Sequence, residues 1–205
     1  EVTTIAAFDP DVFISMTAGN PCLLAIQEVE ASGLYDRLSA AFTPSVCKGI
    51  AAYLAPAGMA ADGYWIVGGG AKDTTDSGKM DEPFIAFARD LISDAGEDAG
   101  ISLTGEGVFR GYAFTEAFRI ADALPGGMSR TNLMLALRNF KIYHPGLLDG
   151  LVTELKGNAD AYFVEGSEYS KFNATDQTWE MIGDVVDANG GTPNCRWDKA
   201  NGGCR

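Results

Sequence analysis

The sequence predicts an α/β fold, in which short buried strands alternate with helices. An apolar run over residues 11–16 is followed by a helical pattern over residues 20–33. A second strand-like run, over residues 38–42, is followed by a helical stretch around residues 50–54. Because strand, loop and helix in this order form the repeating unit of parallel sheets, the two cycles together predict this fold class.

The first unit has recognisable start and stop signals. Asp11 to Met16 is a short, partly β-branched run of the kind that fills a buried strand. We expect Asn20 to be the N-cap of the helix that follows, because its side-chain oxygen can accept from the unpaired backbone amides, and Pro21 suits the first helical position. Gly33 is expected just past the helix end.

The remaining elements fall on both sides of a polar, glycine-rich stretch at residues 68–78, where we expect a boundary between two bodies. A third strand is predicted before it, over residues 63–67. The elements predicted after it are helices over 83–95, 107–124 and 129–140, the last with Ser129 as its N-cap, and a strand over 178–186.

Composition excludes several classes of protein. The chain has 205 residues, of which 46% are hydrophobic, which is enough for a sizeable core. With 15 Lys and Arg against 28 Asp and Glu, the net charge is −13, which argues against a nucleic-acid partner. No apolar run approaches the roughly 18 residues of a membrane-spanning helix.

Sequence motifs of nucleotide-binding, catalytic and metal-binding sites are incomplete in this chain. Gly105 and Gly107 are followed by Arg110 where a dinucleotide fingerprint requires glycine. The only histidine, His144, stands beside Pro145 without a visible orienting partner, so we interpret it as a surface or interface residue. The few His and Cys residues lack ligand spacing, so we expect no metal, no cofactor and no enzymatic activity.

Two loops are the candidate binding site. Thr17, Ala18, Gly19 and Asn20 follow the first predicted strand, and Thr43 to Ser45 follow the second. In an open parallel sheet such loops meet at the carboxyl edge, where ligands bind, and they offer hydroxyls and a helix N-terminus. The alternative is that Asn20 and Ser45 only cap helices.

The four cysteines predict two disulfides, with free thiols in a reducing compartment as the alternative. Cys195 and Cys204 stand in a short Gly/Asn-rich tail, where a covalent bond would order the chain end. Cys22 and Cys47 follow the two candidate binding loops, so a bond between them would tie the rim of the pocket. Geometry decides this second pair, and the sequence leaves it open.

Several segments in a fixed order resemble a known family. They are Phe8 to Ile14 with the helix to Leu34, Ala60 to Tyr64, Gly111 to Ala113, and Ser129 to Leu137. This series resembles the C-terminal half of a type I solute-binding protein of the branched-chain amino acid and amide ABC transporters. The resemblance implies two doubly wound lobes, of which this chain would be a truncated C-terminal portion.

In the family the chain crosses repeatedly between the lobes. By analogy, residues 1–70 are part of lobe two, residues 71–172 are the returning part of lobe one, and residues 173–205 return to lobe two and end in the disulfide-linked tail. The polar stretch at 68–78 then coincides with a hinge.

The resemblance also bears on the ligand. In amino-acid-binding relatives, the loop matching Thr17–Asn20 supplies a contact that is often aromatic, and the loop matching Thr43–Ser45 supplies an acid for the ligand's ammonium. Neither is present here, which favours a neutral or anionic small polar solute. Tyr112 either reaches the cleft from lobe one or packs in the core.

The implied function is solute binding for an ABC importer, with an amino acid, amide or related small molecule held between two lobes. The expected partners are that solute and a membrane permease, with a homodimer of the truncated chain as a further expectation. The expected location is extracellular or periplasmic, with a lipid anchor through an N-terminal segment outside this sequence. The alternative function is a ligand-sensing domain of a receptor or regulator on the same fold.

Overall fold

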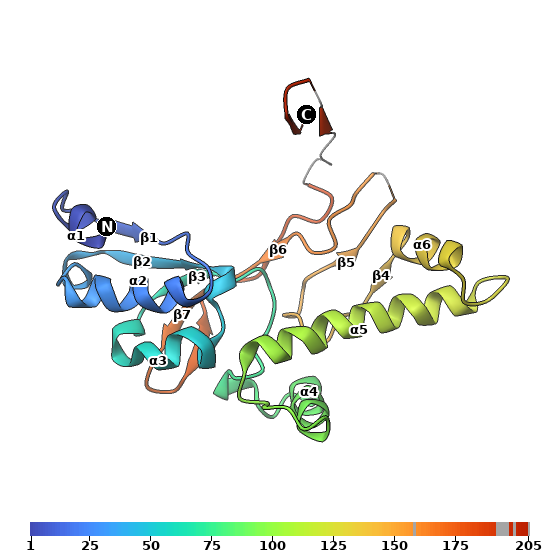
Figure 1. Ribbon diagram of the computed structural model, residues 1–205, viewed down its shortest axis with the longest axis horizontal. Coiled ribbons are helices and arrows are strands. Elements are labelled where there is room, and N and C mark those ends of the chain that lie inside the picture. Colours follow the sequence, from blue (N-terminus) through green and yellow to red (C-terminus); the bar gives the residue numbers. More distant parts are fainter. Residues whose placement is uncertain (158, 192–196, 199, 205) are drawn as a thin grey trace.

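The computed structural model describes residues 1–157, 159–191, 197–198 and 200–204. Figure 1 shows two bodies side by side: a sheet with helices packed against it, and a group of three helices with short strands beside them. The predicted α/β class is confirmed, with a sheet whose first three strands are parallel.

The main sheet combines strands from distant parts of the chain. Its order is β1 (Val12–Ile14), β2 (Ala40–Pro44), β3 (Trp65–Val67), β7 (Tyr169–Asn173) and β8 (Thr178–Met181). The first three strands run parallel, and β7 and β8 add antiparallel to them. The chain therefore leaves the sheet after β3 and returns to it a hundred residues later.

The first strand–helix unit is close to the prediction, with one correction. Helix α2 (Asn20–Ala31) has Gly19, not Asn20, as its N-cap. Gly19 adopts a positive φ of 66°, so the chain turns there and Asn20 already lies inside the first helical turn, where its side chain makes no cap hydrogen bond. Gly33 has a φ of 64° just beyond the helix end, as predicted.

The second unit is less regular than the prediction. A 3-10 turn at Ser45–Cys47 follows β2, and a π-helical turn at Ile50–Leu54 leads into the short α3 (Ala55–Ala57) and a further 3-10 turn at Gly58–Ala61. The structure decides the pairing that the sequence leaves open: a disulfide between Cys22 and Cys47 joins α2 to this unit, with the two Cα atoms 5.7 Å apart.

A single apolar core lies between the sheet and the helices that follow β1 and β2. Its large, fully buried members include Ile26, Leu34, Leu54, Tyr64 and Ile66. The short N-terminal helix α1 (Val2–Ala6) packs against this core through Val2 and Ala6. The core therefore depends on both strand–helix units together.

The second body is mainly helical. It consists of α4 (Pro83–Asp94), α5 (Ser102–Ala123) and α6 (Arg130–Arg138) with the two-stranded pair β4 (Lys141–Ile142) and β5 (Thr153–Glu154). Ser129 caps α6 as predicted, because its hydroxyl accepts from the Asn132 amide at 3.1 Å. Helix α5 begins five residues earlier than predicted.

Some predicted boundaries are wrong near the C-terminal end. The strand predicted over 178–186 is divided into β8 and β9 (Val186–Asp187), with Gly183 at a φ of 78° between them. Strand β9 pairs with β6 (Gly166–Ser167), and β10 (Trp197–Asp198) pairs with β11 (Gly203–Cys204). Cys195, and with it the predicted pairing to Cys204, lies outside the described residues.

The polar stretch at residues 68–78 connects the bodies but is not a loose linker. Asp73 is buried, and its carboxylate accepts from the Ile50 amide at 2.6 Å and from the Thr75 amide at 2.9 Å. Thr75 in turn accepts from the Ala51 amide at 3.2 Å. The stretch therefore caps the π-helical turn, because its polar side chains satisfy the turn's free amides.

A returning segment lies against this stretch. The Gly68 amide donates to the Glu168 carbonyl oxygen at 3.0 Å, and the Gly70 amide donates to the Glu168 carboxylate at 2.7 Å. Glu168 is completely buried and forms an ion pair with Lys48, which also donates to the Ala71 carbonyl. The division into lobes at residues 70 and 172 stays a prediction.

Candidate functional site

A cavity of about 500 Å³ lies between the carboxyl edge of the sheet and helix α5. One wall consists of the residues that follow β2 and β3, namely Ser45, Val46, Gly68 and Gly69. The opposite wall is α5, and the floor comes from the segments around α6, β4 and β5. Both bodies therefore contribute to the same cavity.

The wall at the sheet edge is small and polar. Ser45 is exposed, and Gly69 lies so close that a Cβ there would be 3.6 Å from the Ser45 Cβ. Gly69 has a φ of 66°, and its amide donates to the Ser167 hydroxyl at 3.0 Å. The two glycines, Gly68 and Gly69, therefore let the backbone itself form this side of the cavity.

The wall formed by α5 carries charged and apolar side chains on one helical face. Glu106, Phe109, Arg110 and Ala113 follow the spacing of residues that share a face. Glu106 and Arg110 form an exposed ion pair of 3.6 Å, which leaves both side chains accessible from the cavity. A bound molecule can therefore meet either sign of charge on this wall.

The floor is apolar and partly aromatic. Phe140 and Phe163 stack with ring centroids 5.3 Å apart, and Leu137 and Leu155 complete this surface. The Leu155 amide donates to the Phe140 carbonyl at 2.6 Å, which holds the segments of β4 and β5 together below the cavity. This floor fits an apolar part of a ligand.

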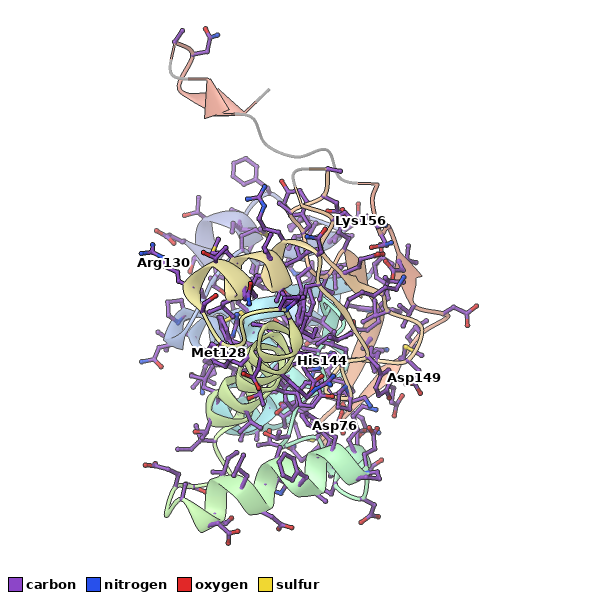
Figure 2. The ribbon with its side chains drawn as sticks, turned by 90° about the vertical axis from the view of Figure 1, so that its right-hand side faces the viewer. Asp76, Met128, Arg130, His144, Asp149 and Lys156 are labelled. Atoms are coloured by element: carbon purple, nitrogen blue, oxygen red, sulfur yellow. A yellow bond between two sulfur atoms is a disulfide. The ribbon has the colours of Figure 1, made fainter. Side chains whose placement is uncertain are left out.

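His144 also lines the cavity. Of the two expected positions, the surface is wrong, and an interface agrees with its place in a cavity lined by both bodies. Its side chain is buried, and Figure 2 shows it in the interior near α5. Nε2 donates to the Phe109 carbonyl at 2.9 Å, and Nδ1 accepts from the Gly146 amide at 3.1 Å, so the ring is neutral. Burial lowers the pKa of His144 below its ordinary value of 6.5.

The predicted site residues are only partly brought together. Ser45 lines the cavity, whereas Thr17, Ala18, Gly19, Asn20, Thr43 and Tyr112 are not part of its lining. Thr17 lies next to the disulfide, with its hydroxyl 2.7 Å from that of Ser15 and 3.7 Å from Cys47 Sγ. Thr43 is buried below this edge, and its hydroxyl has no hydrogen-bond partner.

Tyr112 packs against the α4 side of α5. Its ring is 5.3 Å from that of Phe84 and 5.1 Å from that of His144, both in edge-to-face arrangements. Tyr112 therefore packs against the His144 ring without being part of the cavity lining. Its predicted role in ligand binding, like those of the two loops, stays a prediction.

Sequence reasoning missed the residues of α5 and the two glycines. Phe109 and Arg110 stand at the start of the helix predicted from residue 107, and Glu106 directly precedes it. Gly68 and Gly69 were assigned to the boundary between two bodies. The helical spacing of Glu106, Phe109 and Arg110 is the signal that could have grouped them on one face. The crossing segments determine which face of α5 lies opposite the carboxyl edge of the sheet, so the spacing within the helix does not predict it.

Two further features, a metal-binding cluster and a membrane-spanning helix, are absent from the described residues. No group of three or more His, Cys, Asp or Glu side chains among them is arranged to hold a metal ion. Within the same part of the chain, no helix combines the length and the apolar character needed to cross a membrane.

The parallel sheet, the crossing segments and the cavity at the carboxyl edge define the class of architecture: the chain has the type I periplasmic-binding-protein fold. The three solved structures described below share this fold with the chain and are ABC-transporter solute-binding proteins. No protein-family model matches the chain, and no match is found among curated proteins.

Three solved structures illustrate the similarity. The leucine-, isoleucine-, valine-, threonine- and alanine-binding protein from Brucella ovis, in its closed conformation, is 16% identical with a TM-score of 0.63, over 94% of this chain and 47% of that one. An amino acid ABC transporter substrate-binding protein from Pseudomonas fluorescens Pf-5 is 16% identical with a TM-score of 0.61, over 100% and 50%.

The third is a solute-binding protein of an ABC transporter from Rhodopseudomonas palustris BisB5 in complex with 3,4-dihydroxybenzoic acid. It is 13% identical with a TM-score of 0.62, over 91% of this chain and 48% of that one. The chain thus spans about half the length of the solved structures it matches.

Proposed function

We propose that the chain is part of the solute-binding component of an ABC importer and that a small solute binds in the cavity beside α5. The observation that carries this proposal is the cavity itself, because its walls come from two bodies that are joined by adjacent crossing segments. A site divided in this way closes when the two bodies rotate towards each other. The similarity to three solved structures of ABC-transporter solute-binding proteins supports the same proposal.

The proposed solute is neutral or anionic, with a polar end and an apolar part. The Ser45 hydroxyl and the Arg110 guanidinium are the donors available to the polar end, and the stacked Phe140 and Phe163 accept the apolar part. The cavity offers less to a ligand's ammonium group. Among the described residues of its lining, Glu106 is the only carboxylate, and it is already paired with Arg110.

The proposed partner is an ABC permease, and the proposed location is extracellular or periplasmic. The Cys22–Cys47 disulfide supports an oxidising compartment, because cytosolic thiols are kept reduced. Delivery to a permease requires a released solute, so we expect moderate affinity and full reversibility.

The test is calorimetry on the longest natural polypeptide that contains this chain. The panel comprises amino acids, amides, urea, and small aliphatic and aromatic carboxylates. We expect at least one neutral or anionic compound to bind. A complete lack of binding across the panel overturns the proposal.

Cavity-filling variants locate the binding site. In Ala113→Trp the indole occupies the cavity, so we expect at least about a tenfold loss of affinity for the compound that binds. Ala123→Trp is the matched control, because Ala123 is exposed at the end of the same helix and outside the cavity. Equal affinity in both variants shows that the solute binds elsewhere.

A further inference from the structure

A second cavity, of about 560 Å³, lies where the polar stretch at residues 68–78 meets helix α4. Its lining includes Met181 of β8, which belongs to the sheet body, and Phe84 of α4 and Tyr143, which belong to the helical body. Among the described residues, none lines both this second cavity and the first cavity, the one beside α5. Both bodies therefore also contribute to the second cavity.

A wall of two paired segments separates the two cavities. Ala71 and Leu147 form an antiparallel bridge, and the Lys72 and Leu148 amides beside it donate to carbonyl oxygens of the facing segment at 3.0 and 2.9 Å. Side chains alternate along such segments. Ala71 and Leu147 line the first cavity, whereas Lys72 and Leu148 line the second. The two cavities therefore lie on opposite faces of one wall.

Two lysines share one carboxylate in the second cavity. Lys72 Nζ donates to Glu82 Oε2 at 2.5 Å, and Lys79 Nζ donates to Oε1 of the same group at 3.2 Å. Burial raises the pKa of Glu82, but the hydrogen bonds and charges of the two lysines outweigh burial, so this pKa lies below its ordinary value of 4.5. The cluster therefore has two ammonium groups against one charged carboxylate at neutral pH.

The two ammonium groups have donors left for a further acceptor. Each ammonium has three N–H donors. In the described part of the chain, the Lys79 ammonium donates only to Glu82, and that of Lys72 donates to Glu82 and to the Pro145 carbonyl oxygen at 3.2 Å. The two side chains are 25% and 10% exposed, so water screens their charges less than it does on an open surface. Asp149, the other acid of the lining, is exposed, so solvent screens its charge more strongly.

Much of the remaining lining is apolar. Phe84 and Leu148 of the helical body and Met181 and Val185 of the returning segment contribute this surface. A cavity of about 560 Å³ has more room than a bare inorganic anion fills, and apolar side chains offer such an anion no hydrogen bonds. An anion with an apolar part therefore fits the second cavity better than a purely polar one.

We propose that the second cavity binds a small organic carboxylate. Its oxygens accept from the free N–H groups of Lys72 and Lys79, and its apolar part packs among Phe84, Leu148 and Met181. Because the lining comes from both bodies and from the wall, the bound molecule stabilises the arrangement of the bodies seen here. This site is distinct from the proposed solute site beside α5 and does not depend on it.

Calorimetry with isovalerate tests the requirement for a charge. Isovalerate has a carboxylate and a branched apolar chain, and isovaleramide is its neutral counterpart of similar shape. The protein is the longest natural polypeptide that contains this chain, with Ala113→Trp to fill the first cavity. We expect isovalerate to bind to it and isovaleramide to bind at least about tenfold more weakly, because the amide lacks the negative charge.

Substitutions locate the carboxylate, both in the Ala113→Trp protein and in wild type. Lys79→Gln removes one ammonium, so we expect isovalerate to bind at least about tenfold more weakly. Lys141→Gln is the matched control and should have no effect, because Lys141 also pairs with a glutamate, Glu154, at 3.5 Å but lines neither cavity. Met181→Trp fills the second cavity without changing its charge, so we expect a similar loss from it.

Hydrogen exchange of the Ala113→Trp protein gives a readout that is independent of the lysine substitutions. Isovalerate should slow the exchange of the Lys72 and Leu148 amides, which form the wall, by at least about threefold. The Ser32 amide is the control. It donates to the Glu28 carbonyl oxygen at the end of α2, at 3.0 Å, and its exchange should not change.

Three results overturn the proposal. The first is a lack of isovalerate binding to wild type, or binding that Ala113→Trp abolishes in a folded protein. The second is equal affinity for isovalerate and isovaleramide, which shows that the charge has no role. The third is equal affinity of Lys79→Gln, Met181→Trp and Lys141→Gln for isovalerate, which places the carboxylate elsewhere. None of these results requires a solute in the first cavity, so failure of the proposed function is distinguishable from failure of this site.

Discussion

The two bodies of the molecule differ in how much of their packing lies within the chain. The sheet body has one contiguous core of sixteen buried residues that joins α2, β1, β2, β3, β7 and β8. The helical body has a cluster of only three, Ile85, Ala88 and Phe109, supported by Phe84 and Val108. In this chain the larger core is therefore the one between the sheet and its helices.

Because of this difference, we expect the two bodies to contribute unequally to the free energy of unfolding. The sheet body contains its own disulfide and its own core, so we expect it to dominate the cooperative unfolding of the chain. The helical body depends more on the crossing segments and leaves apolar side chains such as Phe118 on α5 exposed. The following changes test this division, from the largest expected effect to the smallest.

Removal of the buried cation between the bodies has the largest expected effect. Lys48→Met leaves the fully buried Glu168 carboxylate without its ion-pair partner, so we expect the free energy of unfolding to fall by about 3–5 kcal/mol. Urea unfolding measures it. Adding Glu168→Gln should recover part of the loss, and Arg119→Ala, at an exposed pair, should cause no measurable change. A loss no larger than that of Arg119→Ala contradicts the assigned role.

Matched truncations compare the two cores directly. Ile66→Ala removes a buried side chain from the middle of the sheet, and we expect it to cost about 4 kcal/mol. Ile85→Ala makes the same change in the small helical cluster, where neighbours can collapse more easily, so we expect about 2 kcal/mol. Equal losses in urea unfolding argue that the two bodies unfold as one equally packed unit.

Removal of the disulfide tests the sheet body alone. Cys22 and Cys47 are 25 residues apart, and a loop of this length predicts a loss of about 3 kcal/mol in the double variant Cys22→Ala/Cys47→Ala. The reason is the greater freedom of the unfolded chain. Hydrogen exchange should accelerate most in α2 and the turn at Ile50–Leu54, and an effect confined to α5 and α6 contradicts the prediction.

The pH dependence of the helical body has the smallest expected effect. Burial lowers the pKa of His144 in the folded protein below the ordinary value of 6.5, so the unfolded chain binds the proton more tightly. Stability due to the neutral ring is present above pH 6.5, decreases as the pH falls through 6.5, and levels off below the folded pKa. Thermal unfolding of wild type and His144→Phe from pH 7.5 to 5 measures it, and identical pH profiles contradict it.

The elements that the sequence predicted well are those with local signals. Gly33 after α2 and Ser129 before α6 act through their own backbone or hydroxyl, so neighbouring residues suffice to identify them. The Asn20 cap was wrong because Gly19, one residue earlier, takes the turn at a positive φ. The prediction was based on the capping ability of the Asn20 side chain, and it did not take into account the positive φ that glycine adopts at position 19.

The cavity was less predictable because it depends on distant segments. Ser45 was expected at the sheet edge, but its neighbours Gly68 and Gly69 belonged to the stretch predicted as the boundary between the two bodies, without a role in the site. Nothing local to Asp73 indicated that its carboxylate is buried against the Ile50 amide. His144 was expected at the surface or at an interface, and the Phe109 carbonyl and the Gly146 amide satisfy both of its ring nitrogens inside the fold.

The contact between Gly68 and Glu168 has a mechanical consequence. Any side chain at position 68 would collide with the Glu168 carboxylate, so the two crossing segments run as close together as backbones allow. Two adjacent links between two bodies permit bending about the line through both and resist twisting and sliding. We therefore expect any relative movement of the two bodies to be rotation about this single hinge axis.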